Sequence, residues 1–150
     1  MPSIYYKTYY HVIWSTKYGT DSINEKINKI LYEAVHKKIK EQKGSLLEFN
    51  SYLDHCHCLC VIPPKISASD FVGQIKGYSS YETNRITNEE CLKWQRGFGI
   101  LTLSEKGVPF VKKYIQNQEK HHQDNSTVAT LEFIPRDEPT ASPPGVNPQG

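Results

Sequence analysis

The chain has 150 residues, of which 37% are hydrophobic and 23% are charged, and its formal net charge is +2. This is the composition of an ordinary globular domain, and the length is sufficient for one buried core. No apolar run approaches the roughly 18 residues of a membrane helix, and no charged-then-apolar leader opens the chain. We therefore expect a cytoplasmic protein with no membrane partner.

Charge and cysteine content narrow the class further. Residues 131–150 hold one basic and three acidic residues, which leaves 17 basic and 13 acidic residues in the rest of the chain. That surplus is compatible with a polyanionic partner but does not establish one. Three of the four cysteines alternate along one apolar run, where neighbours two residues apart are poorly placed to pair, so we expect reduced thiols.

The first predicted elements are a strand and a helix. Residues 5–15 are rich in aromatic and β-branched side chains with a period of two, which predicts a strand. Apolar residues then recur at helical spacing over 23–39, behind a cap at Asp21 or Ser22. We expect Gly44 to end this helix, because glycine tolerates the left-handed conformation that is common there.

A hairpin follows, with strands over residues 46–53 and 55–62 joined tightly near Asp54. The dipeptide Pro63-Pro64 cannot continue the ladder and ends the second strand.

The remaining predicted elements are a helix, a short strand and a last helix. The helix is capped by Ser67 or Ser69 and runs to about Ile86, the strand covers residues 99–103, and the last helix covers residues 108–122.

The order strand, helix, strand, strand, helix, strand, helix predicts an α+β fold. It is that of a ferredoxin-like split βαβ sandwich with an antiparallel sheet and an added C-terminal helix. We expect one domain over residues 1–130. Residues 131–150 are expected to be a disordered tail, because five prolines and two glycines from Pro135 onward carry no apolar periodicity.

The hairpin's second strand carries the first candidate site. Strand alternation places His55 and His57 on one face, about 6.6–6.8 Å apart along the strand, where both imidazoles can reach one divalent cation. Cys56, Cys58 and Cys60 then point the other way, into a core. A zinc site that combines both residue types is disfavoured, because alternation separates them. A lone His-x-His is a weak signal.

The last helix carries the second candidate site. Tyr114 and Gln118 lie four residues apart, hence on one helix face, and His121 and His122 continue that face. A phenol with a pKa of about 10 needs help to act as a nucleophile, and a metal that polarises a phosphate supplies it. Tyr114 could instead only pack its helix, and the two histidines could belong to a frayed helix end rather than to a metal or phosphate site.

Further segments accompany these two in a fixed order along the chain. They are the aromatic strand with Trp14 and Lys17-Tyr18, Asp54-His55-Cys56-His57, Pro63-Pro64-Lys65-Ile66-Ser67, Lys76-Gly77-Tyr78-Ser79-Ser80, Trp94-Gln95-Arg96-Gly97-Phe98-Gly99, and Tyr114-Ile115-Gln116-Asn117-Gln118. In this order they resemble the single-tyrosine HUH transposases of the simplest insertion sequences, including the REP-associated tyrosine transposases. Cys56 departs from the aliphatic residue that the family more often has.

The resemblance implies a metal-dependent DNA transposase. His55 and His57 would ligate Mg²⁺ or Mn²⁺, and Gln118 would add its amide oxygen. Tyr114 would attack the scissile phosphate of single-stranded DNA at a hairpin-marked end, forming a 5′-phosphotyrosine and releasing a 3′-hydroxyl. The resemblance also implies a homodimer in which the tyrosine helix of one subunit completes the metal site of the other, in trans.

Four basic residues are candidates for contact with DNA phosphates: Lys76, Arg85, Lys112 and Lys113. Each of them could instead belong to a solvated helix face.

The residues are compatible with three further functions. A host-adapted relative that processes repeated hairpins would use the same residues. A ferredoxin-like module could bind nucleic acid without catalysis, and a small regulatory domain could bind a metal. His11 and His36 are expected to be structural.

Overall fold

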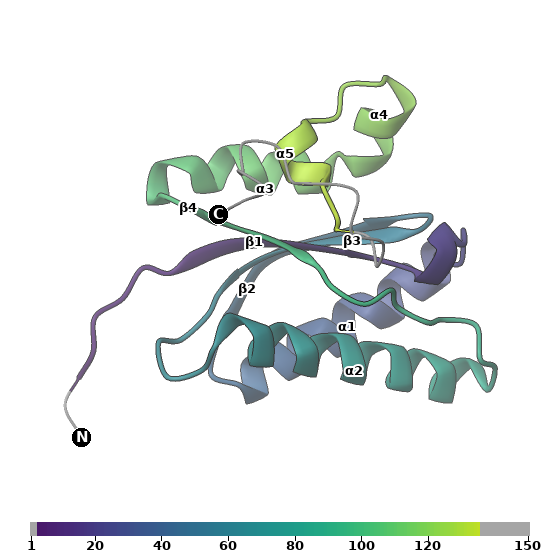
Figure 1. The fold of residues 1–150 in the computed structure, drawn as a ribbon, viewed down its shortest axis with the longest axis horizontal. Helices are drawn as coiled ribbons and strands as arrows, with labels where there is room; N and C mark the ends of the chain where they lie inside the picture. Colours follow the sequence, from purple (N-terminus) through teal and green to yellow (C-terminus); the bar gives the residue numbers. More distant parts are fainter. Residues whose placement is uncertain (1–2, 136–150) are drawn as a thin grey trace.

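Four strands form one antiparallel sheet in the order β2-β3-β1-β4 (Figure 1). They are β1 (Tyr9–Ser15), β2 (Ser45–Tyr52), β3 (His55–Val61) and β4 (Gly99–Leu103). The computed structural model describes residues 3–135 of the chain. Strand β3 is central, since it pairs with β1 on one side and with β2 on the other.

Helices cover both faces of the sheet. The long helices α1 (Glu25–Glu41) and α2 (Ala68–Thr87) lie side by side on one face. The short helices α3 (Val108–Gln116), α4 (Gln118–Gln123) and α5 (Ala129–Glu132) lie on the other, as Figure 1 shows. Two 3-10 turns, η1 (Lys17–Gly19) and η2 (Glu105–Gly107), complete the elements of the described residues. The predicted α+β, ferredoxin-like arrangement with an added C-terminal helix is confirmed.

The start of α1 differs from the prediction. Asn24, not Asp21 or Ser22, caps the helix, and its side chain accepts a hydrogen bond from the backbone N–H of Ile27 at 2.8 Å. Ile23 forms a β-bridge with a residue of the hairpin turn. The chain therefore stays extended through Asn24, and α1 begins at Glu25.

The role of Gly44 also differs from the prediction. The left-handed residue after α1 is Lys43, with φ 66°. A Cβ at Gly44 would lie 2.6 Å from the Val61 carbonyl oxygen and 2.8 Å from the Phe71 ring. Glycine is required there because the backbone passes close to β3 and α2, not because of its own φ angle.

Strand β3 is buried on both faces from His55 to Cys60. Cys56, Cys58 and Cys60 lie in the core formed with α1 and α2. On the other face Leu59 packs against Val111 and Ile115 of α3. The predicted alternation is therefore present, and both faces have a covering layer. We call Cys56, Cys58 and Cys60 the core face of β3, and His55, His57 and Leu59 its site face.

The predicted last helix is divided in two. Asn117, with φ −105° and ψ 28°, separates α3 from α4. Its backbone N–H still bonds to the carbonyl oxygens of Lys113 and Tyr114 at 3.2 Å. The chain changes direction at this break, and both Gln116 and Gln118 stay close to the sheet.

Part of the predicted disordered tail has a definite position. Residues 131–135 follow the fold, and Leu131 is buried against it. The rest of the expected tail, residues 136–150, lies outside the described residues. Between residues 3 and 135 no helix is both long and apolar enough to cross a bilayer.

Candidate active site

The two predicted histidines lie side by side on the site face of β3. Their ring centroids are 5.1 Å apart, and both side chains are buried. The Nδ1 atom of His55 lies 2.9 Å from an Asp54 carboxylate oxygen, and Nδ1 of His57 lies 2.8 Å from Nε2 of His11. Because both Nδ1 atoms are engaged, both Nε2 atoms are left facing the same space under α4 and α5.

Tyr114 and Gln118 face the same space from above. The Tyr114 side chain is only 2% exposed, and its ring centroid lies 6.0 Å from that of His57. The amide oxygen of Gln118 lies 3.4 Å from Nε2 of His55, and its amide nitrogen donates to the Tyr114 carbonyl oxygen. All four residues predicted for the reaction therefore meet within one chain.

Two further residues reach this site. Glu132 is not predicted from the sequence, and the sequence leaves the role of His122 undecided between a ligand site and a frayed helix end. One carboxylate oxygen of Glu132 lies 3.1, 3.2 and 3.3 Å from the Nε2 atoms of His57, His55 and His122. The other oxygen accepts a hydrogen bond from the Tyr114 hydroxyl. His55, His57, His122 and Glu132 each offer one ligand atom, all within 4.8 Å of one another, and we call them the histidine–glutamate cluster.

The sequence signals for these two residues are unequal. His122 stands four residues after Gln118 on one helical face, which is the spacing that brings side chains together. Its Nε2 lies 3.2 Å from the Gln118 amide oxygen. Glu132 carries no local signal, because the segment around it has the composition of a tail.

Two tyrosine rings support the adjacent histidines of α4. His122 stacks on Tyr52 with ring centroids 4.9 Å apart, and His121 stacks on Tyr114 with centroids 4.5 Å apart. His121 also has its Nδ1 atom 2.9 Å from the Ser126 hydroxyl oxygen. His122 therefore belongs to the cluster, whereas His121 packs on the tyrosine ring.

The four residues of the histidine–glutamate cluster differ in the direction of their pKa shifts. Burial disfavours the charged form of His55, but the hydrogen bonds and charges of Asp54 and Glu132 outweigh burial and raise the pKa of His55 to about 9. Burial lowers the pKa values of His57 and His122. Burial opposes ionisation of Glu132 too, yet its bonds to His55 and His57 hold its pKa well below the usual range. The carboxylate of Glu132 therefore stays ionised beside these histidines.

Tyr114 and His11 are both held uncharged. Burial, followed by the hydrogen bond to Glu132, raises the pKa of the Tyr114 phenol above its usual range. Burial lowers the pKa of His11 to about 3, so His11 stays neutral beside His57. A phenol in this environment needs a nearby cation to make its oxygen a useful nucleophile.

The spacing of the cluster suits a divalent cation. Ligands at right angles around an ion with bonds of 2.0–2.1 Å lie about 2.9 Å apart. The Glu132 oxygen lies 3.1–3.3 Å from three imidazole nitrogens, and the Nε2 atoms of His55 and His122 are 3.1 Å apart. Carboxylate oxygens suit Mg²⁺ and Mn²⁺, and imidazole nitrogens suit several transition-metal ions. The residues present could therefore hold a divalent cation.

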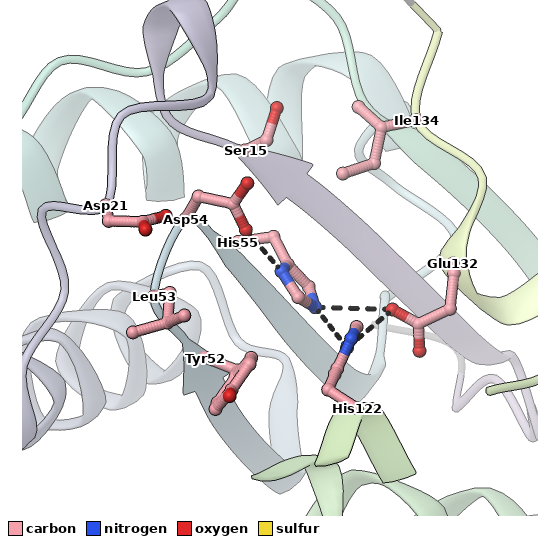
Figure 2. Close-up of a pocket in the computed structure, with 9 residues that line it drawn as sticks. All are labelled: Ser15, Asp21, Tyr52, Leu53, Asp54, His55, His122, Glu132 and Ile134. Atoms are coloured by element: carbon pink, nitrogen blue, oxygen red, sulfur yellow. Dashed lines mark hydrogen bonds and ion pairs between the residues drawn. The ribbon is translucent and has the colours of Figure 1, made fainter. Parts of the chain in front are cut away.

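A pocket opens beside the cluster (Figure 2). His55, His122 and Glu132 point toward one another at its inner end, and Asp54 reaches His55 from the hairpin turn. Asp21 also lines it. The pocket gives the cluster a route to solvent, which a buried site needs in order to admit a ligand.

The four candidate DNA contacts divide between the two helical layers. Lys76 and Arg85 lie on α2, across the sheet from the cluster. Lys76 donates to the carbonyl oxygens of Gln95 and Gly97, and Arg85 pairs with Glu82. Lys112 and Lys113 are exposed on α3 directly before Tyr114.

Comparison with known proteins gives one consistent family. The family described as "Transposase IS200 like" matches residues 4–118. The transposase for insertion sequence element IS200 of Salmonella typhimurium is 30% identical over an alignment of 117 residues, and the match covers 73% of this chain and 75% of the relative.

Two solved structures share the fold. The crystal structure of a protein described as a transposase from Deinococcus radiodurans has a TM-score of 0.61 and 23% identity, covering 79% of this chain and 96% of that one. A REP-associated tyrosine transposase bound to a REP hairpin has a TM-score of 0.57 and 16% identity, covering 89% of this chain and 82% of that one. At these identities the likeness shows the fold alone.

Proposed function

Because this chain belongs to the family of IS200-like transposases, we propose that it cleaves and rejoins single-stranded DNA at hairpin-marked ends. Tyr114 is the nucleophile in this proposal, and His55, His57 and Gln118 hold Mg²⁺ or Mn²⁺. The observation that carries it is the meeting of a phenol, two imidazoles and an amide oxygen at one site, although β3 and α3 are far apart in the chain. A family of transposases implies a DNA-cleaving enzyme, and this is the one place in the described residues where the predicted groups converge.

The substrate class rests on chemistry and on one structural relative. A tyrosine that attacks a phosphodiester needs a strand it can approach, and single strands expose their backbone more freely than duplexes. The REP-associated relative of the same fold is bound to a hairpin. We infer that this chain also takes a hairpin with an adjoining single strand.

The reaction exchanges one phosphodiester for another. The Tyr114 oxygen loses its proton and bonds to phosphorus, while the bond from phosphorus to the 3′-oxygen breaks and that oxygen takes up a proton. The bound cation would polarise the phosphate and stabilise the charge that develops on its oxygens. Attack by another 3′-hydroxyl reverses the step and joins the strands, without an external energy source.

Two neighbouring residues prepare the imidazoles for this role. The Asp54 carboxylate bonds to Nδ1 of His55, and Nε2 of the neutral His11 lies beside Nδ1 of His57. Such contacts select the ring tautomer that turns the Nε2 lone pair toward a metal. His11, expected to be structural, therefore acts as a positioning residue in this proposal.

The subunit arrangement is a separate part of the proposal. The family resemblance implies a homodimer with sites completed in trans. Within the described chain, however, Tyr114 already lies beside His57 of the same chain, and Gln118 beside His55. This geometry favours a site that one chain can complete, and a site in trans would require α3 and α4 to exchange between subunits.

Lys112 and Lys113 are the basic residues that we retain for DNA contact. Both are exposed and lie next to the proposed nucleophile, so a strand at Tyr114 would pass them. The bonds of Lys76 and Arg85 within their own layer support structural roles for those two.

A covalent-adduct assay tests the proposal. Labelled hairpin DNA is incubated with the protein and Mn²⁺, and the denatured mixture is examined for labelled protein. We expect an adduct with the natural chain and with Tyr81→Phe, a matched change at an exposed tyrosine of α2. Tyr114→Phe and EDTA should each abolish the adduct while hairpin binding by Tyr114→Phe persists. An adduct that survives Tyr114→Phe would refute the assignment, and binding without any cleavage would leave only a nucleic-acid-binding module.

Mixed dimers test the subunit arrangement. Tyr114→Phe and His57→Ala chains are each inactive if the proposal holds. Restored cleavage in verified heterodimers would establish sites in trans, whereas inactive heterodimers would establish sites within one chain.

A further inference from the structure

The segment after α4 returns across the cluster and is held at several points. The backbone N–H of Val128 donates to the Tyr114 hydroxyl oxygen at 3.0 Å, and Gln95 donates to the Pro135 carbonyl oxygen at 2.6 Å. Between these points Leu131 is buried, and a Cβ at Gly99 would collide with the carbonyl of Phe133. The segment lies beyond residues 4–118, the stretch that the family match covers.

We propose that Glu132 is an anionic ligand of the divalent cation and couples that cation to Tyr114. This inference rests on the proposed function, because it concerns the same metal and the same nucleophile. It adds a ligand that lies outside the matched stretch of the family. Its side chain comes from α5, and so joins the last described helix to the site.

The two oxygens of Glu132 have separate partners. The Oε1 atom faces the Nε2 atoms of His55, His57 and His122 at 3.1–3.3 Å. This is slightly longer than the roughly 2.9 Å between neighbouring ligands around one small cation. The Oε2 atom accepts a hydrogen bond from the Tyr114 hydroxyl. A single carboxylate therefore touches both the place where a cation fits and the phenol that would attack.

Charge favours the same conclusion. A bound cation would displace the proton of His55. Two neutral imidazoles and an amide would then leave the charge of a divalent cation uncompensated in a largely buried site, whereas a carboxylate offsets half of it. Hard cations such as Mg²⁺ and Mn²⁺ also prefer oxygen ligands. Within residues 3–135 the ion pairs of Glu132 are with histidines alone, so no lysine or arginine competes for it there.

Glu132 couples the cation to Tyr114 because its two oxygens reach both groups. With Oε1 on the cation, Oε2 would hold the phenol oxygen at a set distance from the metal-bound phosphate. The Val128 N–H fixes the same oxygen from the backbone. Correct placement of a nucleophile accounts for a large share of rate enhancement in such reactions.

A different role for Glu132 makes opposite predictions. A carboxylate beside the nucleophile also occupies space that a DNA phosphate could take, in which case it would compete with substrate. Removing its charge would then leave metal affinity unchanged and raise the cleavage rate. A metal ligand behaves in the reverse way on both counts.

Binding of Mn²⁺ to the full chain separates these roles. Free Mn²⁺ is measured by its paramagnetic resonance signal, without DNA, for the natural chain and three variants. We expect Glu132→Gln to weaken Mn²⁺ binding at least about tenfold. Glu119→Gln, a matched change at an exposed glutamate of α4, should leave it unchanged. His57→Ala should abolish tight binding.

Each result has one meaning. If the natural chain binds no Mn²⁺, the metal site of the proposed function fails. If it binds Mn²⁺ and His57→Ala does not, but Glu132→Gln binds within twofold of the natural chain, only the present inference is overturned. Faster cleavage by Glu132→Gln with unchanged affinity would also overturn it.

A second pair of variants covers a folding defect in Glu132→Gln, which circular dichroism would reveal. Glu132→Asp and Glu132→Asn have the same length and differ in charge. The aspartate should bind Mn²⁺ several-fold more tightly than the asparagine, and equal affinities would overturn the inference.

Discussion

The two faces of strand β3 are both buried but are stabilised in different ways. On the core face, Cys56 and Cys58 are fully buried among apolar side chains of α1 and α2. On the site face, His55 and His57 are buried in a network of hydrogen bonds and ion pairs under α3–α5. The same strand thus carries apolar packing on one side and a polar cluster on the other.

This difference shows what each face demands of its neighbours. The core face needs side chains of the right volume, and burial itself supplies the stabilisation. The site face needs a partner for each polar atom, because a buried polar group without one costs free energy. His11 marks the limit of that network, since its Nδ1 atom is buried without a hydrogen-bond partner among the described residues.

The largest expected effect is on the core face. Phe71 of α2 is fully buried, so Phe71→Ala should lower the free energy of unfolding by about 3–5 kcal/mol. Urea denaturation measures this loss. At temperatures where the variant stays folded, its affinity for Mn²⁺ should equal that of the natural chain. A loss of metal affinity in folded Phe71→Ala would show that the two faces are not independent.

Metal should stabilise the site face next most strongly. Mn²⁺ at a hundred times its dissociation constant should add about 2.7 kcal/mol to the free energy of unfolding. Thermal unfolding with Mn²⁺ and with EDTA measures the increment. Phe71→Ala should keep it, because that change lies across the sheet, and His57→Ala should lose it. An equal increment in His57→Ala would place the metal elsewhere.

Acid should weaken the site face through His11. The pKa of His11 is about 3 in the folded chain and has the ordinary value of 6.5 in the unfolded chain. Between these two values the unfolded chain binds a proton at His11 and the folded chain does not. Stability should therefore fall as the pH drops below 6.5, by about 1.4 kcal/mol per pH unit from this residue.

His11→Gln tests that source. The glutamine cannot titrate and can still reach His57, so the fall in stability between pH 6.5 and 5 should be shallower. Equal slopes in His11→Gln and the natural chain would contradict the assignment.

The smallest expected effect is on the solvent-exposed side of α2. Gly77 is exposed in the middle of α2, and an added Cβ would meet no atom within 4 Å. Gly77→Ala should therefore stabilise the fold by about 0.5–1 kcal/mol in urea denaturation. Gly44→Ala, where a Cβ would meet the Val61 carbonyl oxygen, should destabilise it.

The cleavage rate of Gly77→Ala tests whether α2 contacts the DNA. If DNA binds on the side of α3–α5, the rate should match that of the natural chain. A reduced rate with unchanged folding would instead bring α2 into contact with the DNA.

Local patterns in the sequence were sufficient for much of the site. A period of two separated His55 and His57 from the intervening cysteines, because successive side chains of a strand point to opposite faces. A spacing of four placed Gln118 on the face of Tyr114, because a helix turns once in 3.6 residues. These patterns depend only on backbone geometry within a few residues, so they can be read before the fold is known.

Other features depended on contacts between distant segments. Asn24 became the helix cap only because Ile23 pairs with Leu53 of the hairpin. The helix break at Asn117 and the path that follows it carried Glu132 to His57, 75 residues earlier in the chain.

Local patterns therefore predicted the order of the elements, the two faces of β3 and the shared face of Tyr114 and Gln118. The layer that covers each face of β3, and the carboxylate that joins the histidines, depend on how distant segments pack against one another. This is because the periodicity of residue types along the sequence reflects only the direction of each side chain relative to its own backbone. The partner that it meets is decided by the packing of all the elements together.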